Sequence, residues 1–299
     1  MISEPVPLFI NPAAGRGRAR RMLSSIRDLL DASGVPVQLI ESTAPGDLEE
    51  RIFRASANGA ARVIVAGGDG SVHEAVNGLL RANRNTELGV IPLGTGNDFA
   101  KACSLPLHWE DATVLLANRL HDQAPARCMD AGRMNERFFA NSAGIGFDAK
   151  INRIAHGLRL PIGDLVYLVA VFQGMWDGVI TPNVKITYDG GEYEGPITLA
   201  SISNGPWVGG MFHMAPTAKI DDGNLDLVFV EPVGRWRILS LLPKLIKGTH
   251  ISEAEVTCSA IKSFTLNADE PVPSHLDGEI QPLQTEFRIE LLENALRLL

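Results

Sequence analysis

Apolar runs alternate with stretches of helical periodicity over the first 120 residues of the chain. Four short runs rich in Val, Ile and Leu predict strands at residues 6–10, 35–40, 63–66 and 88–91. Helical spacing follows each of them, at residues 19–30, 47–57, 72–80 and in a short segment that begins at Asn97. Residues 71–74 and 47–50 have the S/D-x-x-E form of a capping box, which predicts where two of these helices begin. Strands alternating with helices of this length predict a parallel sheet covered by helices on both faces.

The pattern changes at about residue 125. Short strand-like runs follow at residues 127–132, 137–141, 183–188, 197–203, 224–230, 254–258, 263–267 and 287–291, and helical patterns occur near 162–175 and 235–247. Many short strands separated by turn residues predict an antiparallel sandwich or barrel-like domain. We therefore expect an α/β domain over residues 1–125 and a β-rich domain over residues 126–299, with the last strand as a candidate to return to the first domain. No linker rich in Gly, Ser or Pro separates them, which predicts neighbouring domains with a cleft between them.

Composition and charge narrow the class of protein. The chain of 299 residues is 45% hydrophobic and 21% charged, as globular proteins are. Its net charge of −8 argues against a general nucleic-acid binder, which needs a basic surface. Cys103, Cys128 and Cys258 form no C-x-x-C pair, so we expect neither a disulfide framework nor a zinc site. Without a basic signal segment or an apolar run of the ~18–20 residues that span a bilayer, we expect a cytoplasmic protein, soluble or peripheral to the membrane.

The most informative stretch is Gly67-Gly68-Asp69-Gly70-Ser71, between a predicted strand and a predicted helix. Glycine lets main-chain N–H groups approach a phosphate closely, and the start of a helix adds N–H groups and a partial positive charge. A carboxylate inside such a turn repels a phosphate unless a cation lies nearby. The stretch therefore predicts a site for phosphate together with a metal ion.

Two further glycine-rich stretches follow strands of the first domain. They are Asn11-Pro12-Ala13-Ala14-Gly15 and Gly94-Thr95-Gly96-Asn97-Asp98. Ligands of parallel sheets bind at the carboxyl ends of the strands, where all three stretches are expected. Thr95 offers a hydroxyl, Asn97 an amide and Asp98 a second carboxylate. No lysine precedes Thr95, which excludes a Walker A loop.

Acidic turns mark the second half of the chain. Acids surround a glycine in Lys219-Ile220-Asp221-Asp222-Gly223-Asn224, which is typical of a cation loop and equally of an Asp-Gly hairpin turn. The spacing of an EF-hand is absent. Asp277-Gly278-Glu279 is either a solvated turn or a source of a carboxylate that accepts a proton from an attacking hydroxyl.

One glycine pattern points to a different class of protein. Gly144, Gly146 and Ala149 match the dinucleotide pattern G-x-G-x-x-A. The alternation of strands and helices has ended by this point, and no second strand with a terminal acid follows. We interpret the pattern as a strand-to-helix turn of the second domain and keep a dinucleotide-binding oxidoreductase as an alternative.

Taken together, these stretches resemble the diacylglycerol kinase catalytic domain family. Residues 67–78 resemble its signature, and the other blocks occur in order at residues 11–15, 92–100, 141–148, 203–205, 222–225 and 277–279. The resemblance covers essentially the whole chain and is strongest to the stand-alone bacterial lipid kinases. It implies an α/β nucleotide-binding domain, a β-rich second domain and an ATP site in the cleft.

The resemblance also implies a role for each block. Asp69, Asp98 and Asp130 would organise a catalytic Mg²⁺, and a structural Mg²⁺ would be held by the Asp222 side chain and the carbonyls of Lys219 and Asn224. Either Asp277 or Glu279 would be the general base. The ATP site would be lined by Asn11, Pro12, Ala13, Ala14, Gly15, Thr43, Gly67, Gly68, Asp69, Gly70, Ser71, Val72, His73, Thr95 and Asn97.

Two positions depart from the bacterial pattern. His73 stands where bacterial members more often have asparagine, and sphingosine kinases resemble this chain there. Ala13 and Ala14 replace a position that often carries a hydroxyl, which removes one phosphate contact.

The implied activity is transfer of the γ-phosphate of ATP to a lipid hydroxyl, with diacylglycerol as the first candidate. A sphingoid-base kinase, a phosphatidylglycerol kinase and a soluble-substrate kinase of the NAD-kinase type are the alternatives. The partner would be a lipid at the inner face of the membrane, and a homodimer is a further expectation. Apolar residues in 158–175 and 207–214, with Arg153, Arg159 and Lys244, are candidates for the peripheral contact.

Overall fold

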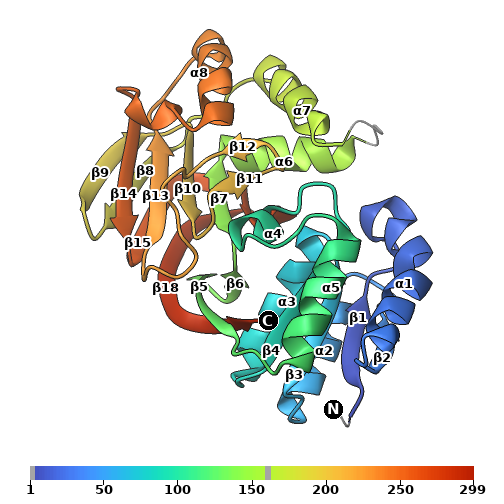
Figure 1. Ribbon diagram of the computed structural model, residues 1–299. Coiled ribbons are helices and arrows are strands. Elements are labelled where there is room, and N and C mark those ends of the chain that lie inside the picture. The colour runs from blue at the N-terminus through green and yellow to red at the C-terminus, as the bar shows by residue number, and fades with distance from the viewer. Residues whose placement is uncertain (1–3, 159–162) are drawn as a thin grey trace. The chain divides into compact units, whose positions relative to one another are not determined.

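The computed structural model describes residues 4–158 and 163–299. It divides into two compact units (Figure 1). Unit 1 comprises Met1–Met129 and Asn294–Leu299, and unit 2 comprises Asp130–Glu293. Strand β18 runs from one unit into the other, because it starts at Gln284 and ends at Leu298.

Unit 1 is an α/β domain, as the alternating pattern predicts. Its elements in chain order are β1 (Val6–Ile10), α1 (Ala14–Ala32), β2 (Val37–Glu41), α2 (Asp47–Ala57), β3 (Arg62–Gly67), α3 (Asp69–Ala82), β4 (Glu87–Pro92), α4 (Asp98–Ala102) and α5 (Trp109–His121). Four strands pair in parallel in the order β2-β1-β3-β4. The end of β18 adds to this sheet, because Arg297 and Leu298 pair in parallel with the start of β4. Helix α5 is absent from the sequence prediction.

Alternating strand residues in unit 1 face two layers of helices. Leu8 of β1 and Ile64 of β3 join a buried cluster with residues of α1 and α5, such as Ile26 and Leu116. Val65, which follows Ile64 in β3, is equally buried. Because successive residues of a strand point to opposite faces of the sheet, Val65 faces the other layer. Helices α2 and α3 pack together, and α3 also contacts β3. The sheet is thus covered on both faces, which explains why its strands are apolar throughout.

The two predicted capping boxes are wrong. Helix α3 begins at Asp69 after Gly68, without a side-chain cap, and Ser71 is buried within its first turn. The Glu74 carboxylate instead accepts a hydrogen bond from the Glu49 N–H of α2 at 3.2 Å. Helix α2 likewise begins without a side-chain cap, after Gly46. The local pattern assigns the Glu74 side chain to the start of its own helix, but this side chain bonds to the neighbouring helix α2.

Unit 2 is built from antiparallel strands and three helices. Its elements in chain order are β5 (Arg127–Met134, from Asp130 on), β6 (Arg137–Phe139), β7 (Ser142–Gly146), α6 (Phe147–Gly157), α7 (Leu165–Trp176), β8 (Asn183–Tyr188), β9 (Gly191–Pro196), β10 (Leu199–Ser203), β11 (Trp207–Val208), β12 (Phe212–His213), β13 (Leu225–Val230), α8 (Arg235–Lys247), the 3₁₀ turn His250–Ser252, β14 (Val256–Ile261), β15 (Ser263–Val272), β16 (Ser274–Leu276), β17 (Glu279–Ile280) and the first part of β18. Strands β7, β9, β11, β12, β16 and β17 had no counterpart in the sequence prediction, and α6 was foreseen only as the helix after the turn at Gly146.

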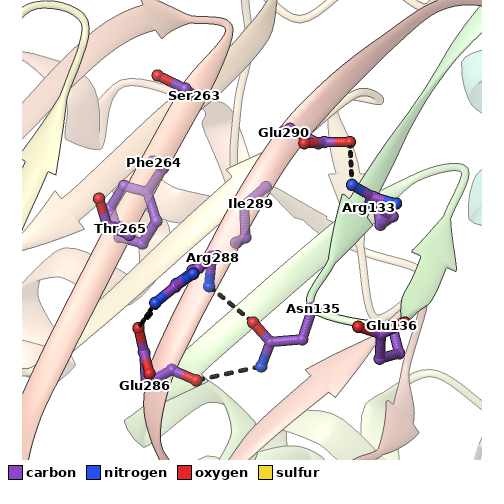
Figure 2. Close-up of a pocket in the computed structure, with 10 residues that line it drawn as sticks. All are labelled: Arg133, Asn135, Glu136, Ser263, Phe264, Thr265, Glu286, Arg288, Ile289 and Glu290. Atoms are coloured by element: carbon purple, nitrogen blue, oxygen red, sulfur yellow. Dashed lines mark hydrogen bonds and ion pairs between the residues drawn. The ribbon is translucent and has the colours of Figure 1, made fainter.

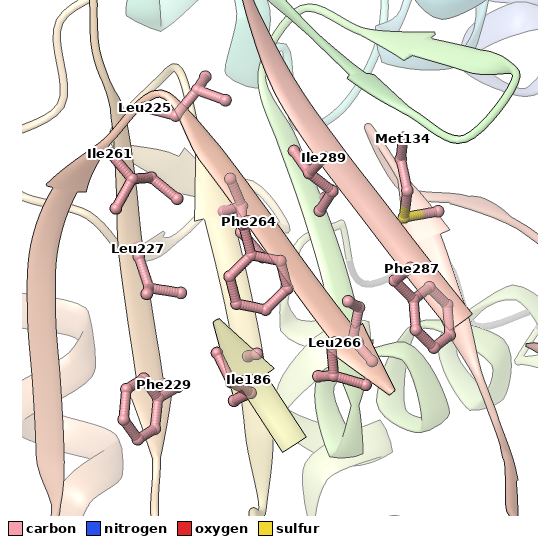
Figure 3. Packing of buried hydrophobic residues seen from close by; sticks show 14 of the residues in the cluster. Met134, Ile186, Leu225, Leu227, Phe229, Ile261, Phe264, Leu266, Phe287 and Ile289 are labelled. Carbon is pink, nitrogen blue, oxygen red and sulfur yellow. The ribbon is translucent and has the colours of Figure 1, made fainter. Parts of the chain in front are cut away.

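The core of unit 2 is a sandwich of two sheets. One sheet has the order β14-β13-β10-β7-β16-β17, and strands β18, β15, β8 and β9 pair in that order in the other. Figure 3 shows side chains of both meeting in one buried cluster, among them Leu227 of β13, Phe264 of β15 and Phe287 of β18. Residues of β13 alternate, since Val228 points away into a second small cluster with Met214. The predicted β-rich second domain is confirmed, and its form is the sandwich.

Three helices share a further apolar cluster in unit 2. Phe147 of α6, Val171 of α7 and Leu242 of α8 belong to it. Helices α6 and α7 are antiparallel neighbours, because Lys150 near the start of α6 donates to the carbonyls of Gly174 and Gly178 at the end of α7. Among residues 4–158 and 163–299, no helix is long and apolar enough to cross a membrane.

The packing of α2 on α3 gives a stability prediction. A Cβ at Gly78 of α3 would lie 2.5 Å from the Glu49 carbonyl oxygen of α2. We therefore expect Gly78→Ala to lower the free energy of unfolding by about 1–3 kcal/mol, the usual cost of overpacking, although alanine favours helix.

The matched control is Gly157→Ala at the end of α6, where a Cβ would meet nothing within 4 Å. This substitution should leave the free energy of unfolding unchanged or raise it by up to ~1 kcal/mol. Urea denaturation of both variants checks this, and equal effects of the two substitutions would contradict the packing argument.

Candidate functional site

Three glycine-rich turns of unit 1 touch through their main chains. A Cβ on Gly68 would lie 2.9 Å from the Gly94 Cα, and a Cβ on Gly15 would lie 2.5 Å from the Leu93 carbonyl oxygen. The Leu93 N–H donates to the Gly67 carbonyl at 2.8 Å, which joins the ends of β3 and β4. The three stretches that the sequence predicts to lie together, after β1, β3 and β4, are therefore in contact.

The two carboxylates of these turns lie at helix starts. Asp69 is in the first turn of α3, and its Oδ1 accepts a hydrogen bond from the Phe99 N–H at 3.2 Å. Asp98 begins α4, is buried, and has its Oδ1 3.4 Å from Lys101 Nζ. Because Phe99 directly follows Asp98, the bond of Asp69 fixes the two acidic turns against each other. This arrangement puts two carboxylates beside main-chain N–H groups that attract anions.

Asn97 has a structural part in the same turn. Its backbone is left-handed, with φ of 50°. Its side-chain Oδ1 accepts from the Gly94 N–H at 3.0 Å, and its Nδ2 donates to the Gly94 carbonyl at 3.1 Å. Asn97 therefore closes the Gly94–Asn97 turn with its own amide, and the exposed Thr95 at the tip carries the hydroxyl open to a ligand.

The remaining residues predicted for ATP divide by burial. The side chains of Ser71, Val72 and His73 are buried in α3, where the His73 ring lies 3.3 Å from Asn77 Nδ2. Residues 68–70 are partly exposed, so the main chain of the turn is the better candidate for phosphate contacts.

Thr43 and the stretch from Asn11 to Gly15 also follow strand ends. Asn11 Oδ1 accepts from the Ala13 N–H at 2.9 Å, and this turn leads through Pro12 and Ala14 into α1. The N–H and hydroxyl of Thr43 both donate to Asp47 Oδ2, at 2.8 and 2.9 Å. The hydrogen bond from the Thr43 N–H is the largest cause that holds the pKa of the Asp47 carboxyl below its usual value, and a hydrogen bond from Arg51 is the next.

In unit 2 the predicted cation loop is held by Asp130. The Asp130 N–H donates to the Ile220 carbonyl at 2.7 Å, and its Oδ2 accepts from the Gly223 N–H at 2.8 Å. Asp222 Oδ1 accepts from the Asn224 N–H at 3.1 Å, which makes the loop a tight turn. Asp130 and residues 219–224 are thus brought together, a proximity that sequence spacing did not indicate.

The chemistry of this loop fits magnesium. Among the described residues, no three side chains of His, Cys, Asp and Glu gather closely enough to hold a metal ion. Mg²⁺ keeps several waters and needs only one or two carboxylates, so Asp222 with the carbonyls of Lys219 and Asn224 is a sufficient donor set.

Asp277 and Glu279 differ in their surroundings. The Asp277 carboxylate accepts three main-chain hydrogen bonds, from the N–H groups of Ala140 at 3.0 Å, Asn141 at 2.8 Å and Ser142 at 3.0 Å. Glu279 is partly exposed, and within the described part of the chain its carboxylate has no hydrogen bond or ion pair. Asp277 holds the start of β7, and Glu279 is the carboxylate open to a substrate.

Asn204 is a residue of this region to which the sequence assigned no role. It is buried, and its Nδ2 donates to the carbonyls of Asp130 and Ala140, both at 2.9 Å. It therefore ties the strand that carries Asp130 to the segment that Asp277 holds. Its only sequence signal was its place in the block at residues 203–205.

The dinucleotide pattern is a turn of the sandwich. Gly144 and Gly146 belong to β7, which pairs antiparallel with β10 and β16, and α6 follows. A Cβ on Gly144 would lie 2.1 Å from Asp148 Oδ2 and 2.3 Å from His275 Nε2. The glycine makes room for side chains of unit 2, and the parallel βαβ unit of a dinucleotide site is absent at this strand.

A groove of about 690 Å³ lies on strands β5, β15 and β18 and contains none of the predicted site residues (Figure 2). Four of its charged side chains pair with one another, since Arg133 pairs with Glu290 at 2.7 Å and Arg288 pairs with Glu286 at 2.5 Å. Asn135 bonds to the main chain of β18 between them. Both arginines that line the groove are therefore paired with carboxylates of β18.

Comparison with known proteins identifies both parts of the chain. Residues 5–128 match the diacylglycerol kinase catalytic domain, and residues 141–299 match the YegS C-terminal NAD kinase beta sandwich-like domain. The diacylglycerol kinase of Bacillus subtilis (strain 168) is 29% identical over 273 residues, which cover 91% of this chain and 88% of that protein. The diacylglycerol kinase of Staphylococcus carnosus (strain TM300) is 28% identical, with coverage of 91% and 87%.

Solved structures agree with this assignment. A putative diacylglycerol kinase from Bacillus anthracis str. Sterne superposes with a TM-score of 0.81 at 29% identity, over 99% of this chain and 96% of that one. The acidic glycine turns of unit 1, the sandwich of unit 2 and these matches lead to one conclusion: the chain belongs to the diacylglycerol kinase catalytic domain family of kinases, in the form that carries a YegS-type C-terminal domain.

Proposed function

We propose that this protein is an ATP- and Mg²⁺-dependent lipid kinase that transfers the γ-phosphate of ATP to the hydroxyl of diacylglycerol, giving phosphatidic acid. The observation that carries the proposal is the contact of three glycine turns at the carboxyl ends of β1, β3 and β4, with Asp69 in the first turn of α3. The names of the relatives support diacylglycerol as the acceptor.

Phosphate binding is assigned to the main chain of unit 1. The first N–H groups of a helix have no partner within the helix and favour negative charge. At α3 these groups follow Gly67 and Gly68, which have no Cβ to keep a phosphate away. Thr95 at the exposed tip of the neighbouring turn would add a hydroxyl contact.

Magnesium would supply charge neutralisation of the phosphates in this proposal. Asp69 and Asp98 of unit 1 are the carboxylates that we assign to the catalytic ion, and Asp130 of unit 2 supports the loop at residues 219–224. The loop at residues 219–224 would hold the structural ion through Asp222. Asp98 is buried, so it is better placed to orient water than to contact a nucleotide directly.

Glu279 is our choice for the general base. Transfer requires that the lipid hydroxyl lose its proton as its oxygen bonds to phosphorus and the bond to the leaving ADP breaks. An acceptor needs a carboxylate oxygen open to the substrate, and the three N–H groups on Asp277 occupy its carboxylate. Glu279 lies two residues away without such partners.

A lipid-transfer assay tests the activity. With labelled ATP and Mg²⁺, we expect phosphate transfer to vesicles that contain diacylglycerol, and weaker or no transfer to sphingosine, ceramide or phosphatidylglycerol. Asp69→Asn should lower the rate at least ~100-fold, because a lost preorganised charge at the reacting group typically costs this much.

The matched control is Asp111→Asn, which removes an exposed acid from the first turn of α5 in the same unit and should keep full activity. Preference for sphingosine or phosphatidylglycerol would support those alternatives. Phosphorylation of a soluble acceptor alone, independent of vesicles, would reject the lipid kinase.

The assignment of the base predicts different results for two neighbouring acids. Glu279→Gln should lower turnover at least ~100-fold, to a residual rate that can still be measured, and leave the melting temperature unchanged. Asp277→Asn replaces an acceptor of three N–H bonds by a group that also donates, so it should lower the melting temperature by several degrees. Thermal unfolding and turnover measured on both variants check this, and an active Glu279→Gln enzyme would sink the assignment.

The membrane contact is proposed for the exposed side of α7. Leu165, Val169, Phe172 and Trp176 recur at the spacing of one helix face, and Trp176 is 86% exposed. The opposite side of α7 packs into the cluster with α6 and α8. An exposed apolar stripe with a terminal Trp fits the interface of a bilayer, where aromatic rings gather.

Helix α8 supplies the matching charge. Trp236 is 78% exposed, and Arg235 beside it and Lys247 at the other end of α8 are exposed as well. Basic residues beside exposed apolar ones favour a surface of anionic lipid. A second copy of the chain is the weaker candidate, because the α7 stripe offers on the order of 500 Å² of side chain at ~150–250 Å² per whole aromatic residue, less than the roughly 800 Å² per partner of a stable dimer.

The structure narrows the membrane candidates named from the sequence. In residues 207–214, Phe212 and Met214 are buried and Trp207 stacks on His213. Lys244 pairs with Glu253 at 2.5 Å, and Arg153 is exposed on α6. Arg159 lies outside the described residues.

A charge placed on α7 tests the contact. Phe172→Glu should reduce co-sedimentation with vesicles containing diacylglycerol and phosphatidylglycerol at least tenfold. The control Leu283→Glu alters an equally exposed residue, 53% against 54%, and should bind as the unaltered protein does. Unchanged vesicle binding by Phe172→Glu, or a change only in self-association without vesicles, would contradict the proposed membrane contact.

A further inference from the structure

Two buried side chains form hydrogen bonds with the main chain of Gly278, the residue that precedes Glu279. Asn152 of α6 donates through Nδ2 to the Gly278 carbonyl at 2.5 Å. The Gly278 N–H donates to His275 Nδ1 at 3.3 Å. Both polar groups of the Gly278 main chain are therefore held, one from a helix and one from strand β16.

A carboxylate lies beside His275 at ion-pair distance. His275 Nδ1 accepts the Gly278 N–H, which leaves Nε2 as the nitrogen that can donate. Nε2 lies 3.4 Å from Asp148 Oδ2, in the first turn of α6. The imidazole is 2% exposed, so the contact is shielded from water. Gly144 leaves the room for both groups, since a Cβ there would collide with each.

The turn does not need this support in order to close. Asp277 and Gly278 join β16 to β17, and both have positive φ, 49° and 89°. Asp-Gly is a preferred pair for such a two-residue hairpin turn, which is stable without side-chain help. Burying a histidine, a carboxylate and an amide beside it costs free energy that a hairpin alone would not require.

We propose that His275, which lies beside Asp148, and Asn152 are positioning residues that fix the direction of Glu279. This inference rests on the proposed function, in which Glu279 is the base. The hold on Gly278 limits rotation about the backbone bonds that lead into Glu279. A base must lie within hydrogen-bond reach of the proton that it removes, and a shift of 1 Å can lower the rate about 10²-fold.

The test compares three variants of the full chain. His275→Leu removes the acceptor for the Gly278 N–H, and we expect kcat to fall about 10- to 100-fold while the KM for ATP stays within about twofold. His275→Asn places an amide oxygen near the position of Nδ1 and should recover most of kcat. Asn152→Leu, which removes the other contact, should also lower kcat, and it serves if His275→Leu does not fold.

Two further readouts separate positioning from a structural role. Amide hydrogen exchange at residues 277–279 should become faster in His275→Leu, without ATP or lipid present. In a Glu279→Gln background, His275→Leu should cause no further loss of rate, because the group that it positions is gone.

Unchanged kcat in the folded His275→Leu and Asn152→Leu variants overturns the inference, as does the same fold-loss with and without Glu279. An active Glu279→Gln enzyme is a different outcome. It removes the proposed base itself, whereas an inactive Glu279→Gln with a fully active His275→Leu removes only the positioning role.

Discussion

The candidate site of unit 1 depends on main-chain contact between turns, which only glycine permits. A Cβ on Gly94 would lie 2.6 Å from the Gly68 Cα, and a Cβ on Gly15 would collide with the carbonyl of Leu93. The parallel sheet brings these turns to one edge, and the glycines let them touch. Once they touch, the Phe99 N–H reaches Asp69, and the acids of two turns acquire a fixed relation.

The regular part of the fold could be predicted because its signals are local. Strand β1, helix α2, strand β8 and helix α8 begin and end where apolar spacing places them. The α/β domain and the β-rich domain follow from the change of period at about residue 125. Helix α5 was missed although it is long, and α6 was foreseen only as the end of a turn after Gly146.

Contacts distant in sequence account for what local patterns could not supply. Ser71 and Glu74 have the spacing of a capping box, yet Glu74 bonds to the N–H of Glu49. Asn97 carries the amide expected at a binding loop, yet both ends of that amide close on Gly94. The candidate site shows the same limit. The glycine turns are visible in the sequence, whereas the pairing of Asp148 with His275, more than 120 residues apart, had no signal beyond the place of Asp148 in the block at residues 141–148.

The carboxylates of unit 2 differ in the hydrogen bonds that they accept from main-chain N–H groups. Asp130 and Asp277 are each committed to main-chain N–H groups, one at the Gly223 turn and one at the start of β7. Such bonds engage oxygen lone pairs of a carboxylate and fix the direction in which it points. The Glu279 carboxylate accepts no such bond, so its direction must be fixed in another way if it is to act as the base. His275 and Asn152 fix the Gly278 main chain, and through it they set the direction of the Glu279 side chain. The Glu279 carboxylate therefore stays open while its direction is set.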